Sequence, residues 1–354
     1  MYRKGEKSKE SQDARNSSVL RSWFQRWVWA SYANFDHVEK EIVRDKKNYS
    51  LIKHHKKHIG EPAIIVGAGI SLEKLIPLLK DWKGVIFAPE SMASTMQYYG
   101  HQAEYICLFD ANQTAWDLFL AGYNWKGSTL VTHPSVDPKA IEKWKHDKIY
   151  YLMMHFARLN AMPETEGKNL LEVEKEVKEQ LLGFDFFENI LPMVYKHIGA
   201  SILNAGCVVN NAIEVANFMG YGPLFLCGVD FGFKDWIDRY PQMKKVGGRW
   251  KKDDLRIVEH EEAGKKVGIP IGREIIISDN GIPTTDEMSE YKLALMSVYK
   301  LDRPQLFDCS DGIITELPKA DIKEVVEKNG EGFEDRYRTD EEIVRSSNDY
   351  FNRR

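Results

Sequence analysis

The chain has 354 residues, a net charge of -4, 29% charged residues and four cysteines. This length suits about two domains, or one large α/β domain with additions. The charge provides no global positive field for binding nucleic acid or an anionic membrane. The cysteines form no CxxC pair, which argues against a zinc site and a disulfide framework.

No run approaches the roughly 20 apolar residues that a membrane helix needs. The first residues are polar and lack the apolar region of a secretory signal. We therefore expect a soluble cytoplasmic protein with no integral membrane segment and no nucleic-acid partner.

The N-terminal region divides into two parts. Residues 1–18 are polar and charged, which predicts disorder. Residues 19–58 follow a helical pattern that predicts a helical extension rich in aromatic side chains. We expect these aromatics to dock on the core or on a second copy of the chain, giving a homo-oligomer. The alternative is a membrane-surface helix, which the many acidic residues disfavour.

Short apolar runs of strand length recur after Glu61, separated by helical or loop-like stretches. The runs are Ala63–Val66, Val85–Ala88, Tyr105–Phe109, Thr129–Thr132, Ile149–Met154, Leu224–Val229 and Gln305–Phe307. Continuous apolar strands that alternate with helices indicate a parallel sheet covered on both faces. We predict an α/β fold over residues 59–320, with a Rossmann-like, doubly wound and mostly parallel sheet.

Two stretches interrupt this alternation, and a third follows it. The apolar period of about 3.6 residues predicts a helical insertion at about 160–198. The polar stretch at about 234–284 is too long for an ordinary connection and predicts a lid-like insertion, with a basic centre around KKVGGRWKKDD. Residues 321–354 are highly charged and predict a helical tail with a solvated end.

The first apolar run leads into Gly67-Ala68-Gly69-Ile70-Ser71, followed by a helical pattern. Glycines allow a tight turn and a close backbone approach to an anion, and a helix start offers free N–H groups. Ser71 is expected to cap that helix or to donate to a phosphate. Leu72 occupies the third glycine position of G-x-G-x-x-G, and no Gly-Lys-Ser/Thr follows. The turn predicts phosphate binding, with a simple tight turn as the alternative.

Polar side chains follow most of the other predicted strands. In chain order they are Glu90 and Ser91, Asp110, His133, His155, Asp230 and Ser310. Each by itself has a plain explanation as a helix cap or a buried structural residue. Ligands bind outside the carboxyl ends of parallel strands, so together these groups predict a cleft at that edge.

A second glycine turn, Asn204-Ala205-Gly206, precedes a predicted helix that ends at Gly220 and Gly222. Its inward-facing residues are expected to be Val208, Ala212, Val215, Ala216 and Met219. The following strand ends in Gly228-Val229-Asp230. Two turn–helix units of this kind suit a two-sided nucleotide cleft.

The segments IIVGAGISLEKLIPLLK and NAGCVVNNAIEVANFMGYGPLFLCGVDFGF resemble a family with two known activities. It includes archaeal 6-hydroxymethylpterin diphosphokinase and the motility-associated-factor flagellin glycosyltransferases. Its first motif is usually G-A-G-P-S-L, where this chain has Ile70 in place of proline. QLFDCSDGIITELP resembles the family's final strand, and G-x-D-F gives a fainter likeness to bacterial sialyltransferases that use CMP-sugars. The resemblance covers roughly residues 61–318.

The resemblance implies a nucleotide ligand, and three hypotheses follow from it. The first is a glycosyltransferase-like enzyme that uses a CMP-sugar or UDP-sugar donor, with an unknown acceptor. The second is transfer of diphosphate from ATP to a pterin alcohol, with Mg²⁺. The third is a non-catalytic nucleotide-binding or protein-binding module that kept the fold, which the departure at Ile70 motivates.

In the enzyme hypotheses, His133 acts as general base, and Asp230 and Asp110 complete the catalytic set. Asp230 orients a ribose or sugar hydroxyl, and both carboxylates hold Mg²⁺ if an ion is needed. The residues predicted to bind the nucleotide are Gly67, Ala68, Gly69, Ser71, Glu90, Ser91, Asn204, Ala205, Gly206 and Ser310.

Overall fold

The computed structural model describes residues 9–44, 49–111, 115–124, 126–145, 147–156, 186–204, 206–232, 255–260, 265–270, 276–299 and 305–333. Its centre is a seven-stranded sheet in the order β13-β8-β1-β2-β3-β4-β5, and every neighbouring pair is parallel. The strands are β1 (Ala63–Val66), β2 (Val85–Pro89), β3 (Tyr105–Leu108), β4 (Thr129–Thr132), β5 (Ile149–Tyr151), β8 (Leu224–Cys227) and β13 (Leu306–Asp308).

The strand order changes direction once, at β1. The chain adds β2, β3, β4 and β5 on one side of β1, and then adds β8 and β13 on the other side. The carboxyl ends of β1 and β8 therefore flank the topological switch point, where ligands bind in doubly wound sheets. The α/β, Rossmann-like fold class predicted from the sequence is confirmed.

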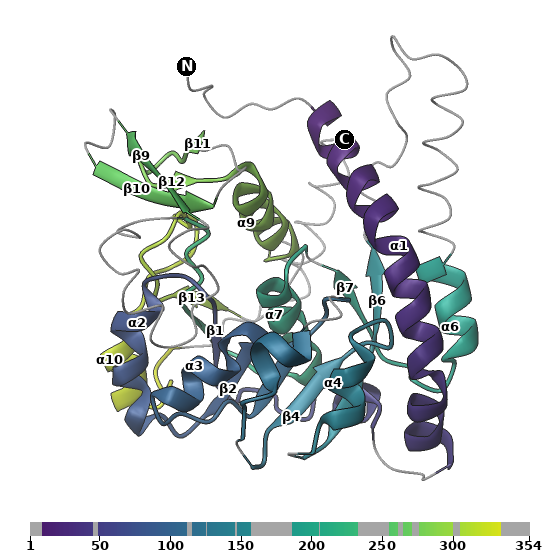
Figure 1. Cartoon of the computed structure of the whole chain (residues 1–354). Coiled ribbons are helices and arrows are strands. Elements are labelled where there is room, and N and C mark those ends of the chain that lie inside the picture. Colours follow the sequence, from purple (N-terminus) through teal and green to yellow (C-terminus); the bar gives the residue numbers. More distant parts are fainter. Residues whose placement is uncertain are drawn as a thin grey trace, which may run out of the picture.

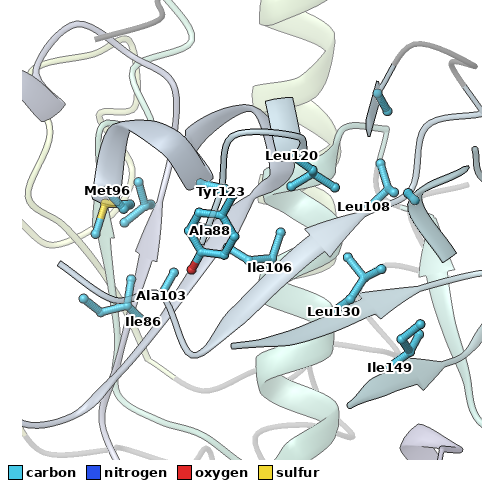
Figure 2. Close-up of a cluster of buried hydrophobic side chains, with 14 of the residues drawn as sticks. Ile86, Ala88, Met96, Ala103, Ile106, Leu108, Leu120, Tyr123, Leu130 and Ile149 are labelled. Atoms are coloured by element: carbon cyan, nitrogen blue, oxygen red, sulfur yellow. The ribbon is translucent and has the colours of Figure 1, made fainter. Parts of the chain in front are cut away.

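Alternate side chains of the strands enter two separate cores, as the period of two in a strand requires. Ile86, Ala88, Ile106, Leu108 and Leu130 point to one face, where they pack beside one another (Figure 2). The helical elements on this face are α2 (Leu72–Leu75), η3 (Ile76–Asp81), α3 (Ala93–Tyr98), η5 (Trp116–Leu120), α4 (Pro138–Lys143) and α10 (Ile322–Glu327). Several of the predicted strands are apolar on both faces, as expected where helices cover both.

The other face carries α7 (Val208–Met219) and α9 (Asp286–Tyr299), which lie together in Figure 1. The carboxyl end of α7 meets the amino ends of the strands, since the Lys56 N–H donates to Phe218 O and Ala63 N–H to Pro223 O. Helix α7 therefore runs antiparallel to the strands, and its N-terminus lies at the edge where the strands end. As predicted, α7 ends at Gly220, which is left-handed with φ 96°.

The N-terminal helix α1 (Lys9–Glu39) begins before the predicted helical extension at 19–58 and ends within it, and it lies beside α6 (Leu191–Val194) in Figure 1. We expected disorder over residues 1–18, but residues 9–18 are helical, and no proline or glycine interrupts this stretch. Residues 1–8 lie outside the described part. None of the described helices is long and apolar enough to cross a bilayer.

Three further pairs of strands lie outside the central sheet, one with a strand on either side of the predicted helical insertion and two within the predicted lid. Strand β6 (Met153–Phe156) continues from β5 and pairs in parallel with β7 (Ser201–Asn204), a strand that the apolar pattern missed. Within the predicted lid, β9 (Leu255–His260) pairs with β10 (Lys265–Pro270), and β11 (Ile276–Ile277) pairs with β12 (Pro283–Thr284). The basic centre of the lid, residues 157–185 of the helical insertion and residues 334–354 of the tail lie outside the described residues.

Candidate functional site

The loops that follow β1 and β8 interlock at the switch point. The Gly67 N–H donates to Cys227 O at 2.8 Å, and the Gly69 N–H donates to Gly228 O at 2.7 Å. A Cβ on Gly67 would lie 2.3 Å from Gly228 O, and one on Gly69 would lie 2.5 Å from the same oxygen. Such distances are too short for any side chain, so both positions require glycine to admit the β8 loop. The sequence predicted that these glycines allow a ligand to approach the backbone closely. In the structure, the loop that follows β8 makes that close approach.

Asp230 fastens the two loops together. Its carboxylate accepts the backbone N–H of Ser71 at 2.8 Å, and its other oxygen accepts the Ser71 hydroxyl. The side chain of Ser71 makes no capping bond to α2, so the predicted cap is absent and the hydroxyl serves Asp230 instead. Asp230 is 4% exposed. The carboxylate therefore accepts a hydrogen bond from one of the N–H groups that were predicted to bind a phosphate.

Burial controls the protonation of Asp230. Desolvation raises the pKa of its carboxyl group to about 6, while the two bonds from Ser71 lower it and the charges of Asp308 and Asp311 raise it further. The group therefore titrates close to neutral pH. A buried carboxyl group with a raised pKa near a sheet edge is a common feature of functional sites.

Ser310, predicted to bind a nucleotide, is used inside the protein. Its hydroxyl accepts the Val229 N–H at 3.0 Å and donates to Leu226 O at 3.1 Å. The buried Asp308 accepts the Ser310 N–H at 2.8 Å and also pairs with Lys319. These contacts hold the end of β13 against the end of β8, so Ser310 braces the switch point rather than presenting a free hydroxyl.

Three further predicted residues follow the next strands along the same edge. Glu90 follows β2, Asp110 follows β3 and His133 follows β4. Neighbouring strands lie about 4.8 Å apart, so these strands lie roughly one, two and three such spacings from β1. Glu90 is 7% exposed and His133 is 1% exposed, whereas Asp110 is only half-buried. Asp110 is thus the most accessible of the three.

The environment of His133 does not suit direct contact with a substrate. Its Nδ1 accepts the Ser135 N–H at 2.9 Å, within its own loop. Burial lowers its pKa to about 4. The ring is therefore neutral at pH 7, and one of its nitrogens already stabilises the turn that follows β4.

Helix α7 carries buried polar residues that sequence reasoning did not single out. Asn210, Asn211 and Glu214 are 1%, 3% and 3% exposed, respectively. The Asn210 amide donates to Tyr291 O of α9 at 2.9 Å, and a Cβ added at Gly206, which has φ 88°, would lie 3.3 Å from the Tyr291 ring. The sequence VVNNAIEVANFM contains a pattern that could have identified these residues, because polar side chains are unusual on a helix that packs against an apolar sheet. The residues predicted inward at Ala212, Val215, Ala216 and Met219 are indeed buried, and Val208 is half-buried.

The remaining predicted residues divide into accessible and undescribed ones. Ala68 at the tip of the β1 turn and Gly206 before α7 are exposed, and Ser91 is half-buried. Ala205 and the side chain of Asn204 lie outside the described residues. The accessible backbone of the first turn and that of the second therefore both lie at the edge where the strands end.

The carboxylates do not form a metal centre by themselves. Within the described residues, no three His, Cys, Asp or Glu side chains are placed to hold one ion. Asp230 follows β8 and Asp110 follows β3, with β1 and β2 between them, so the two strand ends are about 14 Å apart. A single Mg²⁺ held by both carboxylates does not fit this spacing, because magnesium ligands lie at about 2.1 Å from the ion.

The model of the family described as 6-hydroxymethylpterin diphosphokinase MptE-like matches residues 33–236. This range is more than half of the chain. The chain belongs to the MptE-like family. The matched range includes the β1 turn, α7 and the Asp230 loop, while α9 and β13 lie beyond it.

A solved structure of the MAf glycosyltransferase from Magnetospirillum magneticum AMB-1 is similar at 16% sequence identity and a TM-score of 0.44. The likeness covers 90% of this chain but only 42% of the glycosyltransferase chain. At that TM-score it carries no argument about the site. A comparison with curated proteins found no match.

Proposed function

We propose that this protein is a nucleotide-dependent transferase of the glycosyltransferase-like type. It transfers a sugar from a nucleotide-sugar donor to an acceptor hydroxyl and releases the nucleotide. The observation that carries the proposal is the pair of accessible glycine turns at the switch-point edge, one held by Asp230 and one opening α7. Family membership supports a nucleotide ligand in general.

In this proposal the phosphates bind at the tip of the β1 turn, at the exposed Ala68. Asp230 is a positioning residue, because its bonds to Ser71 fix the turn in one conformation. The donor extends toward the second turn at Asn204–Gly206, near the N-terminus of α7, whose partial positive charge favours an anionic group. Glu90 and Ser91 directly follow β2, the strand that pairs with β1.

We assign the general base to Asp110 in preference to His133. A general base must come within hydrogen-bond reach of the acceptor hydroxyl, and Asp110 is the more accessible of the two. Any Mg²⁺ would need the phosphates of the donor as further ligands beside one carboxylate, as is common for this ion.

Binding is tested with a thermal-shift panel of CMP, UDP and ATP, each with and without Mg²⁺. A ligand at 100 times its Kd adds about 2.7 kcal/mol to the unfolding free energy, which raises Tm by several degrees. The proposal expects such a shift from CMP or UDP. If no nucleotide raises Tm under any of these conditions, the proposal fails.

The position of the phosphates is tested with Ala68→Asp, which places a negative charge at the tip of the turn. Like charges in contact cost several kcal/mol, so we expect nucleotide affinity to fall at least about tenfold. Ala121→Asp is the matched control, because Ala121 is also exposed but lies after η5, away from the strand ends. Equal affinities for the two variants would contradict the proposed position.

The family description favours a second candidate, transfer of diphosphate from ATP to a pterin alcohol. The Oδ or hydroxyl groups of the protein need not change covalently: the pterin oxygen bonds to the β-phosphorus, and AMP leaves. This reaction predicts release of AMP that depends on both the pterin alcohol and Mg²⁺. A sugar transferase instead releases CMP or UDP. A non-catalytic module would bind nucleotide and release neither product. Asp110→Asn would then change no product release.

A further inference from the structure

A basic segment lies at the opposite edge of the sheet from the candidate site. Residues 53–58 read Lys-His-His-Lys-Lys-His without interruption, in a chain whose net charge is -4. Lys53, Lys56 and Lys57 are exposed, and so is Lys148 at the start of β5. We call residues 52–59 together with Lys148 the basic platform.

The three histidines of the platform pack on aromatic rings, two of them stacked and His55 tilted. His54 stacks on Tyr150 with ring centroids 4.2 Å apart, and His58 stacks on Tyr221 at 4.4 Å. His55 packs at 4.8 Å from Phe218. These contacts tie the segment to the body of the protein, so its lysines are displayed from a fixed surface.

Backbone bonds tie the same segment to the end of α7. Lys56 N–H donates to Phe218 O and His58 N–H donates to Met219 O, each at 3.0 Å. Basic residues complement the negative end of a helix, which explains part of the composition. It does not explain the two exposed isoleucines that flank the segment, Ile52 at 43% and Ile59 at 64% exposure.

The positive charges are close enough to affect one another. Burial, together with repulsion from Lys57, His58 and Lys148, lowers the pKa of His54 to about 4. Two acidic residues, Glu61 and Asp147, border the platform, and Glu61 pairs with His58 at 3.0 Å. The lysines outnumber these acids.

We propose that the basic platform docks this protein on an anionic lipid surface, with its lysines at the headgroups and Ile52 and Ile59 inserted between them. Lysines attract anionic lipids and aliphatic side chains add apolar burial, which together are the two signals of peripheral binding. A nucleic-acid partner would use rings for stacking on bases, but the histidines cover Tyr150, Phe218 and Tyr221.

Docking of this kind fixes the orientation of the protein. The platform contacts the carboxyl end of α7, a helix of 12 residues, which is about 18 Å long. The N-terminus of that helix lies at the candidate site. The docked protein therefore directs the candidate site away from the bilayer, and the inference does not depend on the proposed function.

The test is co-sedimentation of the full chain with vesicles of phosphatidylcholine alone, or of phosphatidylcholine and phosphatidylglycerol in equal amounts. We expect binding only to the anionic vesicles, weakened by salt. The triple variant Lys56→Glu, Lys57→Glu, Lys148→Glu is expected to bind roughly 100-fold more weakly, at about fivefold or more per lysine. The double variant Ile52→Ser, Ile59→Ser is expected to weaken binding as well.

The matched control is Lys80→Glu, Lys83→Glu, Lys323→Glu, which changes as many exposed lysines on the side that carries η3 and α10. This control should bind anionic vesicles as the unchanged protein does. All variants should have the same Tm as the unchanged protein. Absence of vesicle binding would overturn the proposal. So would an equal loss in the control, an isoleucine variant that binds normally, or binding of single-stranded RNA in place of vesicles.

Discussion

At the residue scale, Asp230 is the group whose role changed most between sequence and structure. The sequence placed it at a strand end and predicted contact with a ligand hydroxyl or a metal ion. In the structure its carboxylate is buried against Ser71, where it closes the glycine turn. This contact depends on two segments 159 residues apart in the chain, so no local pattern predicts it.

Asp230 gives the stability a specific pH dependence. Its folded pKa of about 6 exceeds its ordinary value of 3.8, so the folded protein holds this proton more tightly than the unfolded chain. Ionisation therefore lowers the unfolding free energy as pH rises through about 4 to 6, by roughly 2–3 kcal/mol. Asp230→Asn should remove this loss.

Urea denaturation of both proteins across that pH range provides the measurement. The stability of Asp230→Asn relative to the unchanged protein is expected to increase with pH and to level off above about 6. A constant difference at all pH values would show that the carboxyl group titrates normally.

The close approach of the two loops makes a second prediction at this scale. Gly67→Ala places a methyl group 2.3 Å from Gly228 O, and backbone atoms on both sides cannot move independently. We expect a loss of at least about 2 kcal/mol in unfolding free energy, as overpacking of a rigid site causes. Gly122→Ala is the control, because nothing lies within 4 Å of its added Cβ; it should be neutral or slightly stabilising.

At the element scale, α1 supports the loop that carries His133. Asn34 donates to Pro134 O at 2.8 Å and to Val136 O at 3.0 Å, and the hydroxyl groups of Ser31 and Ser135 share a hydrogen bond. The sequence predicted a helix here and aromatic docking on the core or on a second copy. Phe24, Trp27 and Phe35 do pack against the core of the same chain, while association of copies stays a prediction.

Asn34→Ala tests this support. The change leaves two buried carbonyl groups without their donor, which costs about 1–3 kcal/mol in unfolding free energy. Hydrogen exchange should rise in residues 133–136 and in α1, while β1 and β8 keep their protection. Tyr32→Ala is a suitable control, because Tyr32 is 85% exposed on the same helix. Equal exchange in the two variants would contradict a supporting role for Asn34.

At the scale of the whole molecule, stability should be greatest where the sheet is paired and covered on both sides. Strand β1 lies between β8 and β2, and all four of its residues are fully buried. Strand β13 pairs within the sheet with β8 alone among the described strands. The candidate site thus rests on the most protected part of the fold at β1, with a more exposed edge at β13.

Native-state hydrogen exchange measures this gradient. Amides of Ile64–Val66 are expected to exchange only through global unfolding, and those of Leu306–Asp308 through smaller openings. The two sets should therefore differ in their dependence on low urea concentrations. If β1 exchanged as readily as β13, the centre of stability would lie elsewhere.

The sequence alone determined the parallel sheet, because each buried strand is visible in the sequence as a short apolar run between helices. It also determined the two glycine turns, the helix at Val208–Met219 and the list of polar groups at the strand ends. Only the tertiary structure decided which of those groups meet. Burial and pairing depend on strand order, which joined Asp230 to Ser71, enclosed His133, turned Ser310 inward and left Asp110 accessible. Strand order arises from contacts between distant segments, and for that reason no single stretch of the chain encodes it.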